Sequence, residues 1–338
     1  MHARSPRLAG SDIRADTSET RRGRRVFAAT LVGLAAGGLA LWLRLSGRTN
    51  FSDFHPIWFA ARAVLRHSDP YVAVARNFIA PFYYPLPAAL VGLPFSLLPL
   101  QVAGPVFVAL GFGLLAYGLT ARAWWPLIAL ASYPALDSVV LCQWSPILTA
   151  AALLPWLGWL AAAKPTTGIL TVGSFLSRRW LGFNIAAGVV LTVIATACWP
   201  QWIGEWLDSV RSAHHFVPMM FRPGGALLLL ALLRWRRPEA RMLALMAVVP
   251  QTGVGYDALP LVLVPTNRRE ALALGFLSFA AVPFLVPETS TPDTWVRALA
   301  HNQMVYLVAL YLPALAAVIT RPNVGEARDE HERVPAST

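Results

Sequence analysis

The chain has 338 residues, of which 56% are hydrophobic and only 13% are charged. About a quarter of the residues in a soluble domain are charged, so this composition excludes an ordinary soluble protein and predicts an integral membrane protein. The formal net charge of +11 would suggest nucleic acid as a partner for a soluble domain. Here the basic residues form short clusters between apolar runs, as in cytoplasmic loops of membrane proteins, so we expect no nucleic-acid partner.

Residues 1–25 are polar and basic, and they lack hydrophobic periodicity. We therefore expect a disordered cytoplasmic tail that ends at Arg24 and Arg25. The apolar run over residues 26–43 is long enough to span a bilayer, and the basic cluster before it favours a cytoplasmic N-terminus. A twin-arginine export signal is the alternative reading, but no small-residue cleavage site follows the run.

Residues 46–87 then form the predicted first outer loop. Apolar side chains from Phe54 to Leu65 repeat at helical spacing, with Arg62 and Arg66 on another face. This pattern predicts an amphipathic helix in the membrane interface, where aromatic rings and arginines meet headgroups. A simple surface anchor is the alternative, but it does not explain the aspartates at the two ends of this helix.

Further apolar segments follow, interrupted by many of the 27 prolines of the chain. With the first span they total roughly ten to twelve membrane segments, both termini lie in the cytoplasm, and residues 321–338 form a second disordered tail. Many segments are shorter than the ~20 residues that a span needs, and broken helices at membrane depth line a cavity or are buried. We therefore expect an all-α, polytopic bundle over residues 26–320 that encloses a polar cavity. The segments are 86–98, 102–120, 124–141, 145–163, 166–177, 181–199, 223–233, 242–265 (as two half-length helices), 271–286 and 303–320.

Ionisable side chains near or inside such segments are candidates for function. They are Asp53, Asp137, Lys164 and Asp257, and Lys164 is the single lysine beside 27 arginines. Helix capping is the alternative for Asp137 and Asp257. Cations on the outer side are also informative, because the positive-inside rule disfavours them there. Among the arginines on the predicted outer side, Arg222, which precedes Pro223, is the best candidate to hold a lipid phosphate. The alternative is that its side chain snorkels to the membrane surface without binding a ligand.

Two cysteines, Cys142 and Cys198, lie beside apolar segments, and we expect both to be buried, inert thiols. No group of His, Cys, Asp or Glu has metal-ligand spacing. The sequence therefore predicts neither a metal nor a cofactor.

Several short motifs resemble those of a known family. They are Ser52-Asp53-Phe54, Ala60-Ala61-Arg62, Asp69-Pro70-Tyr71, Tyr84-Pro85 with Pro87, Gln143-Trp144-Ser145-Pro146 and Lys164-Pro165. Over residues 50–179 this pattern resembles glycosyltransferase family 87. These polytopic GT-C enzymes include polyprenyl-phosphate-mannose-dependent mannosyltransferases. The resemblance implies a GT-C fold, an active site on the periplasmic or exterior face of the plasma membrane, and a lipid-phosphate sugar donor. It also implies that Asp53, as the early outer-loop aspartate, is the catalytic base.

The expected function is therefore the inverting transfer of mannose or another sugar to a hydroxyl of a lipid or glycan acceptor. Asp53 takes the hydroxyl proton, Lys164 and Arg222 hold the phosphate, and Arg62 or Arg66 guides the lipid. Asp69 is the rival base, although its place before Pro70 favours a structural turn. The remaining predicted substrate contacts are His55, Tyr71, Tyr84, Gln143 and Asp257. The alternatives are a transporter or flippase of lipid-linked sugars, and an inactive GT-C-like scaffold.

Overall fold

The computed structural model of the chain describes residues 10–175, 177–213, 216–286 and 292–324. Within these ranges every regular element is a helix, which confirms the predicted all-α class. The elements of the first half are α1 (Gly10–Leu45), α2 (His55–Leu65), α3 (Pro70–Asn77), α4 (Pro87–Ser96), α5 (Leu100–Leu119), η1 (Trp125–Leu130), α6 (Tyr133–Val140), α7 (Ser145–Leu153), η2 (Pro155–Ala162) and α8 (Pro165–Phe175). Those of the second half are α9 (Arg178–Cys198), α10 (Trp202–Ser212), η3 (Met219–Phe221), η4 (Gly225–Arg234), α11 (Pro238–Val248), η5 (Gly255–Leu263), α12 (Arg268–Ala280), η6 (Val282–Phe284), α13 (Pro292–Tyr306), η7 (Leu307–Tyr311) and α14 (Leu312–Ile319).

Four helical stretches in the described residues are long and apolar enough to cross a membrane, namely Thr20–Leu45, Leu100–Leu119, Arg178–Cys198 and Thr294–Ile319. The chain therefore has the character of a membrane-embedded protein. The predicted total of ten to twelve membrane segments is not reproduced as full-length spans, because prolines divide the other apolar runs into pieces. The predicted division of residues 242–265 into two helices is confirmed by α11 and η5.

Two predicted boundaries differ from the structure. Helix α1 already begins at Gly10, within the predicted disordered tail, because a helix nucleated by the apolar span extends cheaply into Arg- and Glu-containing sequence. Residues 1–9 and 325–338 of the two predicted tails lie outside the described residues. Helix α13 begins at Pro292, within the stretch between the predicted segments 271–286 and 303–320, which we expected to be an outer loop. It buries Ala298 and Leu299 on one face, so packing extends this helix beyond its most apolar part.

Helix α1 packs along α5 through small residues. A Cβ added to Gly33 would lie 2.6 Å from the Ala109 carbonyl oxygen, and one added to Gly37 would lie 2.9 Å from that of Pro105. The two backbones approach closely only because these positions carry no side chain, as is common for helices packed in membranes.

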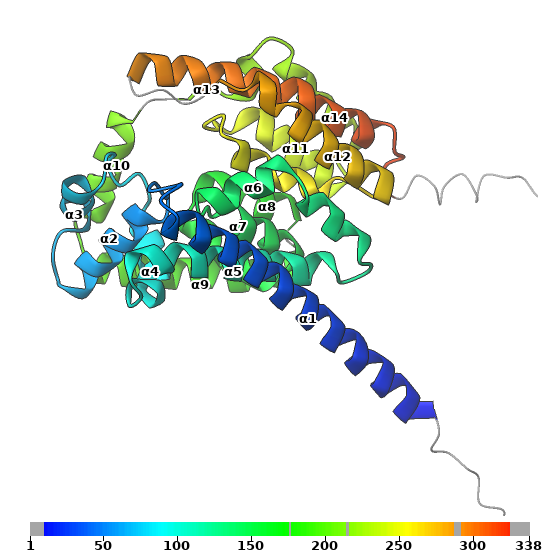
Figure 1. Cartoon of the computed structure of the whole chain (residues 1–338), viewed down its shortest axis with the longest axis horizontal. Coiled ribbons are helices and arrows are strands. Elements are labelled where there is room, and N and C mark those ends of the chain that lie inside the picture. Colours follow the sequence, from blue (N-terminus) through cyan, green and yellow to red (C-terminus); the bar gives the residue numbers. More distant parts are fainter. Residues whose placement is uncertain (1–9, 176, 214–215, 287–291, 325–338) are drawn as a thin grey trace, which may run out of the picture.

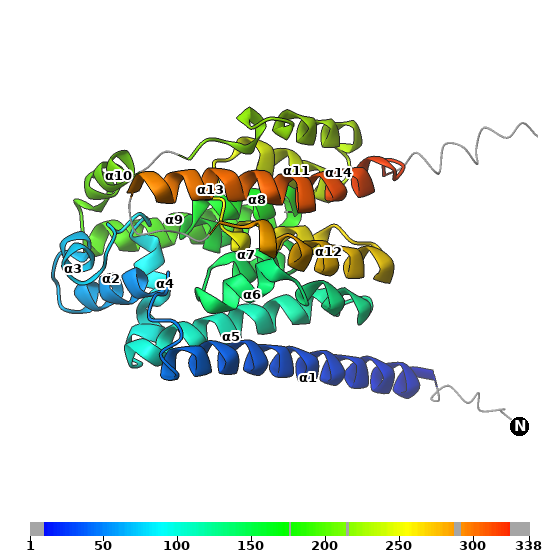
Figure 2. The same cartoon turned by 45° about the horizontal axis from the view of Figure 1, so that its top comes forward.

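The layers of the bundle are visible in two views (Figures 1 and 2). Helices α1 and α5 form one side, α13 and α14 lie on the opposite side, and α6, α7 and α8 lie between them. Helices α2, α3 and α10 gather near the C-terminal end of α1. The apolar side chains form two buried clusters, one mostly from the first half of the chain and one mostly from the second.

Candidate active site

A hydrogen-bonded chain joins the predicted base to the single lysine. The Gln143 side-chain amide donates to a carboxylate oxygen of Asp53, and the Lys164 ammonium donates to the Gln143 Oε1 atom at 3.2 Å. Asp53 and Gln143 are 90 positions apart in the sequence, and Gln143 and Lys164 are 21 apart, yet all three meet at one place. Gln143 is 1% exposed, whereas Asp53 and Lys164 are both partly exposed. The buried amide thus holds two charged groups that solvent or a ligand can reach.

A backbone hydrogen bond also holds the segments around Asp53 and Gln143 together. The Asp53 amide donates to the Leu141 carbonyl oxygen at 3.0 Å, so the loop after α1 is tied to the end of α6. Between them Cys142 is buried, as predicted, and adopts a left-handed conformation with φ of 50°. This conformation is uncommon for a residue with a side chain, and the turn directs the next residue, Gln143, toward Asp53. Cys198 was also predicted to be buried, but it is exposed because most of α9 lies on the outside of the bundle.

Helix α5 accommodates this turn with a glycine. A Cβ added to Gly104 would lie 3.1 Å from the Cys142 sulfur and 3.4 Å from the Ser52 hydroxyl oxygen. Both contacts are with residues next to the site, so the size of residue 104 sets how closely the turn approaches α5.

Lys164 occupies the N-terminal cap of α8. Its carbonyl oxygen accepts the Gly168 amide at 2.9 Å, and Pro165 follows it as the first helical residue. A cation at the positive end of a helix is unfavourable, and an anion bound there removes the penalty. The ammonium also lies 5.1 Å from the centroid of the Tyr256 ring, which gives it a favourable cation–π contact.

A second carboxylate faces Lys164 from η5. Asp257 lies within electrostatic range of the ammonium, and its carboxylate accepts the Thr252 hydroxyl at 2.6 Å and the Thr252 amide at 2.8 Å. Asp137 accepts the Tyr256 amide at 2.9 Å, so it caps the start of η5 from another helix. The expected capping role of Asp137 is thus present across the bundle, whereas Asp257 accepts bonds from the loop before it.

Three other predicted contacts lie beside this centre. Tyr84 is within electrostatic range of Asp53 and Asp257, and the Tyr71 hydroxyl donates to the Tyr84 carbonyl oxygen at 3.3 Å. His55 begins α2, two residues after Asp53. Burial, and to a smaller extent the nearby Arg44 guanidinium, lower the pKa of His55 to about 4. His55 is therefore neutral at physiological pH.

Asp69 has a structural role. Its carboxylate accepts the Tyr71 amide at 2.8 Å and the Val72 amide at 3.0 Å, which caps the N-terminus of α3. This geometry explains the Asp69-Pro70-Tyr71 motif by local structure and favours Asp53 over Asp69 as the base.

The predicted cations Arg62 and Arg222 lie outside the hydrogen-bonded centre. The Arg62 guanidinium stacks on the Trp58 ring at 4.7 Å and lines a pocket of about 360 Å³ with Arg66, between α2 and α3. Arg222 donates to the Gln303 Oε1 atom at 2.8 Å.

Gln303 links Arg222 to the centre indirectly. Its amide nitrogen donates to the Gln251 carbonyl oxygen at 2.8 Å, and the next residue, Thr252, bonds Asp257. Arg222 is therefore connected to the site through the loop before η5, but its guanidinium is already occupied by Gln303.

Sequence reasoning missed three residues of this region. Thr252 lies in the break between α11 and η5, and Tyr256 is the second residue of η5, so the break in the apolar run was the available signal for both. Arg44 is 9% exposed at the end of α1 and donates to the Ala40 and Val140 carbonyl oxygens, within range of His55 and Cys142. The available signal was a cation at the outer end of the first predicted span.

Among the described residues no group of three or more His, Cys, Asp or Glu side chains is arranged to hold a metal ion. The centre instead offers a carboxylate that can accept a proton, a cation at a helix N-terminus and a second carboxylate. No family model matches the chain, and no match is found among curated proteins or solved structures.

Proposed function

We propose that the chain is a membrane glycosyltransferase that moves a sugar from a polyprenyl-phosphate donor to a hydroxyl of a lipid or glycan acceptor. The carrying observation is the hydrogen-bonded chain from Asp53 through Gln143 to Lys164. One buried amide is bonded to both a carboxylate and an ammonium, and both charged residues are partly exposed. Group transfer from a phosphate to a hydroxyl needs this combination, because a proton must leave one reactant and negative charge grows on the other.

In the proposed step the acceptor hydroxyl oxygen attacks the anomeric carbon of the sugar. Asp53 takes the hydroxyl proton, and the bond between the anomeric carbon and the phosphate oxygen breaks. Its electron pair stays on the polyprenyl phosphate, and attack opposite to the leaving group inverts the anomeric configuration. A carboxylate base is effective here because a neutral hydroxyl is a weak nucleophile until its proton is removed.

Lys164 is the proposed partner of the leaving phosphate. Its ammonium and the N-terminus of α8 place fixed positive charge where negative charge develops, and such preorganised charge lowers the barrier. Asp257 and Tyr84 are the proposed contacts for sugar hydroxyls, because both lie beside the charged pair. The pocket that Arg62 lines is the proposed guide for the donor lipid, and phosphate contact by Arg222 requires its bond to Gln303 to open.

The proposed site faces the exterior or periplasmic side of the plasma membrane. The supporting features are the run of basic residues before the first span and the position of Asp53 just after that span. Membrane lipids and the two substrates are the proposed partners.

The test uses the full chain in lipid vesicles with a panel of radiolabelled polyprenyl-phosphate sugars, mannose first, and a lipid extract of the producing cells as acceptor. Released polyprenyl phosphate and labelled product are both measured. The Asp53→Asn variant keeps size and one hydrogen-bonding oxygen, and it is expected to abolish transfer while donor binding persists. Asp208→Asn is the control, since Asp208 is an exposed aspartate paired with Arg211 on α10.

Movement of the lipid-linked sugar across the vesicle membrane without product formation would indicate a flippase instead, if this movement is unchanged in Asp53→Asn. Donor binding with neither product nor movement for any sugar would indicate an inactive scaffold. Equal turnover of Asp53→Asn and the unmodified chain would remove Asp53 as the base.

A further inference from the structure

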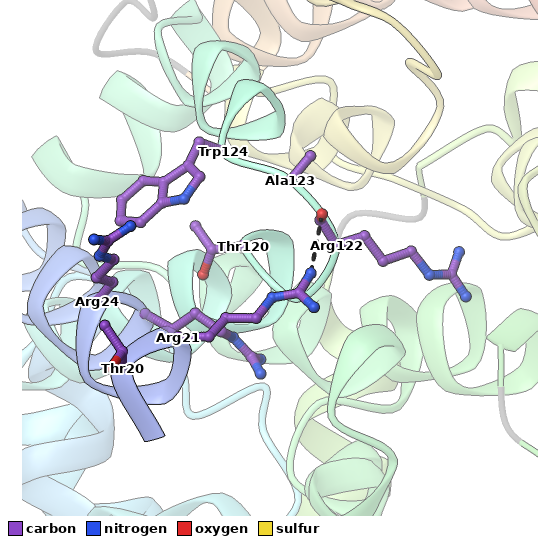
Figure 3. A pocket seen from close by; sticks show the side chains of 8 residues that line it. Thr20, Arg21, Arg24, Thr120, Arg122, Ala123 and Trp124 are labelled. Carbon is purple, nitrogen blue, oxygen red and sulfur yellow. Dashed lines mark hydrogen bonds between the residues drawn. The ribbon is translucent and has the colours of Figure 1, made fainter. Parts of the chain in front are cut away.

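A strongly basic pocket lies between the first part of α1 and the turn that follows α5 (Figure 3). Its volume is about 480 Å³. It is lined by Thr20, Arg21, Arg24, Arg25, Thr120, Arg122, Ala123 and Trp124. Four of these residues are arginines and none is acidic, so the described lining concentrates positive charge without an acidic side chain to balance it.

Helix geometry forces this concentration. Arg21, Arg24 and Arg25 are three and four residues apart on α1, so they project from one face of the helix. Like charges at this spacing repel each other. Within the part of the chain that the structure describes, Arg24 and Arg122 form neither an ion pair nor a side-chain hydrogen bond.

Two of the arginines are held in place by the protein. Arg21 donates to the Arg122 carbonyl oxygen at 3.3 Å, as the dashed line in Figure 3 shows. Arg25 donates to the Tyr117 carbonyl oxygen at 2.8 Å and stacks over the Tyr117 ring at 4.1 Å. The Arg25 Nε atom is buried and has no hydrogen-bond partner among the described residues. An orphaned donor of this kind, beside unpaired guanidinium groups, points to an anionic ligand.

The surroundings favour a lipid over a soluble anion. Trp124 at the rim is 50% exposed, and an exposed indole beside arginines is typical of the headgroup level of a bilayer. The next turns of α1 expose Phe27, Leu31 and Leu34, which are 64%, 51% and 66% accessible. These side chains form an apolar surface that continues from the pocket along α1 and suits acyl chains.

The pocket is also separate from the proposed active site. Arg25 and the end of α1 at Leu45 are 20 residues apart, which corresponds to about 30 Å of helix, the thickness of a bilayer core. The basic pocket and Asp53 therefore lie at opposite ends of the first candidate span.

We infer that this pocket binds the headgroup of an anionic phospholipid, with a two-phosphate headgroup preferred over a single phosphate. Four arginines and a volume of about 480 Å³ match two phosphates better than one. The guanidinium groups contact phosphate oxygens, and the acyl chains lie along the exposed apolar face of α1. The inference does not depend on glycosyl transfer.

The experiment titrates the full chain, in a mild detergent, with four separate probes and counts bound molecules by native mass spectrometry. The probes are diphosphatidylglycerol, phosphatidylglycerol, phosphatidylcholine and inorganic pyrophosphate. We expect diphosphatidylglycerol to bind most tightly, phosphatidylglycerol more weakly and phosphatidylcholine most weakly of the three lipids. Pyrophosphate should bind more weakly than diphosphatidylglycerol. In a variant with Arg21, Arg24 and Arg25 each replaced by Gln, diphosphatidylglycerol affinity should fall by at least about tenfold, since each basic residue near an anionic lipid contributes several-fold.

The control replaces Arg236, Arg268 and Arg269 by Gln, which removes the same charge from exposed positions on the same predicted side. The single variant Arg24→Gln is a second test, because Arg24 makes no described hydrogen bond and its loss leaves the fold intact. Equal losses in the pocket and control variants, or equal affinity for phosphatidylcholine, would overturn the inference. Pyrophosphate binding as tight as the lipid would also overturn it, in favour of a soluble polyphosphate ligand.

Discussion

The regions near the two ends of α1 hold cations in opposite electrostatic surroundings. At the C-terminal end, one lysine is joined through a buried amide to Asp53, and a second carboxylate, Asp257, is close by. At the N-terminal end, several arginines share a pocket whose lining contains no acidic residue. A cation balanced by carboxylates is suited to a reaction in which charge moves, whereas an unbalanced cluster is suited to retaining a permanent anion.

The largest expected effect is on the rate of sugar transfer, which should depend on the region near the C-terminal end of α1 and not on the basic pocket at its N-terminal end. Asp53→Asn should lower sugar transfer by ~10²–10⁴-fold, the range for loss of a positioned general base. The triple Arg→Gln variant of the basic pocket should keep transfer within about twofold of the unmodified chain at saturating donor, because the pocket lies far from Asp53. Initial rates of released polyprenyl phosphate measure both. A comparable loss in the two variants would mean that the ends of α1 act as one site.

Lys164→Gln should lower the transfer rate by ~10²–10³-fold, as expected when a group that stabilises developing charge is removed. Lys164→Arg keeps the charge but cannot reproduce the compact contact with Gln143, so we expect it to recover only part of the rate. Separate measurements of kcat and KM check the assignment. A change confined to KM would place Lys164 in ground-state binding alone.

Gly37→Ala tests the close packing of α1 against α5, on which the relative positions of the two regions depend. The added Cβ would lie 2.7 Å from the Ala109 side chain and 2.9 Å from the Pro105 carbonyl oxygen. Overpacking of this kind costs roughly 1–3 kcal/mol, so the thermal midpoint in detergent should fall. Gly38→Ala is the matched control, since no heavy atom lies within 4 Å of its added Cβ. Equal midpoints for the two variants would show that α1 and α5 do not depend on this contact.

A smaller effect is expected from ionic strength, which should weaken lipid binding at the basic pocket more than it changes the transfer rate at the Asp53 site. Raising ionic strength from about 0.05 M to 0.5 M shortens the range of exposed charges, so diphosphatidylglycerol retention by the basic pocket should weaken several-fold. The partly buried Asp53–Gln143–Lys164 chain is screened less, so the transfer rate at saturating donor should change little. Parallel salt titrations of lipid retention and turnover provide the measurement, and a stronger salt effect on turnover would contradict the contrast.

The smallest expected effect concerns His55. Its pKa is lowered to about 4 in the folded chain, against an ordinary value of 6.5. Between these values the unfolded state binds a proton that the folded state does not, so stability falls as pH decreases from about 6.5 toward 4. His55→Gln removes this contribution and should flatten that part of the pH profile of the thermal midpoint. An unchanged profile would show that His55 is not the group responsible.

The class of the protein and several of its local structures follow from the order of its residues alone. Its apolar runs define the candidate spans, and the helical spacing after Asp53 predicts α2, which starts at His55. Pro146 and Pro165 mark the starts of α7 and α8, because proline is favoured in the first turn of a helix. Asp69 before Pro70 likewise predicts a capped turn. Each of these features depends on neighbouring residues only.

Which distant side chains meet, in contrast, depends on how the helices pack in three dimensions. Gln143 reaches Asp53 because the Asp53 backbone is tied to Leu141 and the left-handed Cys142 redirects the chain. Arg222 was expected to reach the same place directly, but Gln303 binds it and connects it to the site only through the loop before η5. The extension of α1 to Gly10 creates the basic pocket from arginines that the sequence suggested were part of a disordered tail. Local patterns specify helices and their ends, whereas contacts across the bundle depend on how closely backbones such as those of α1 and α5 can approach.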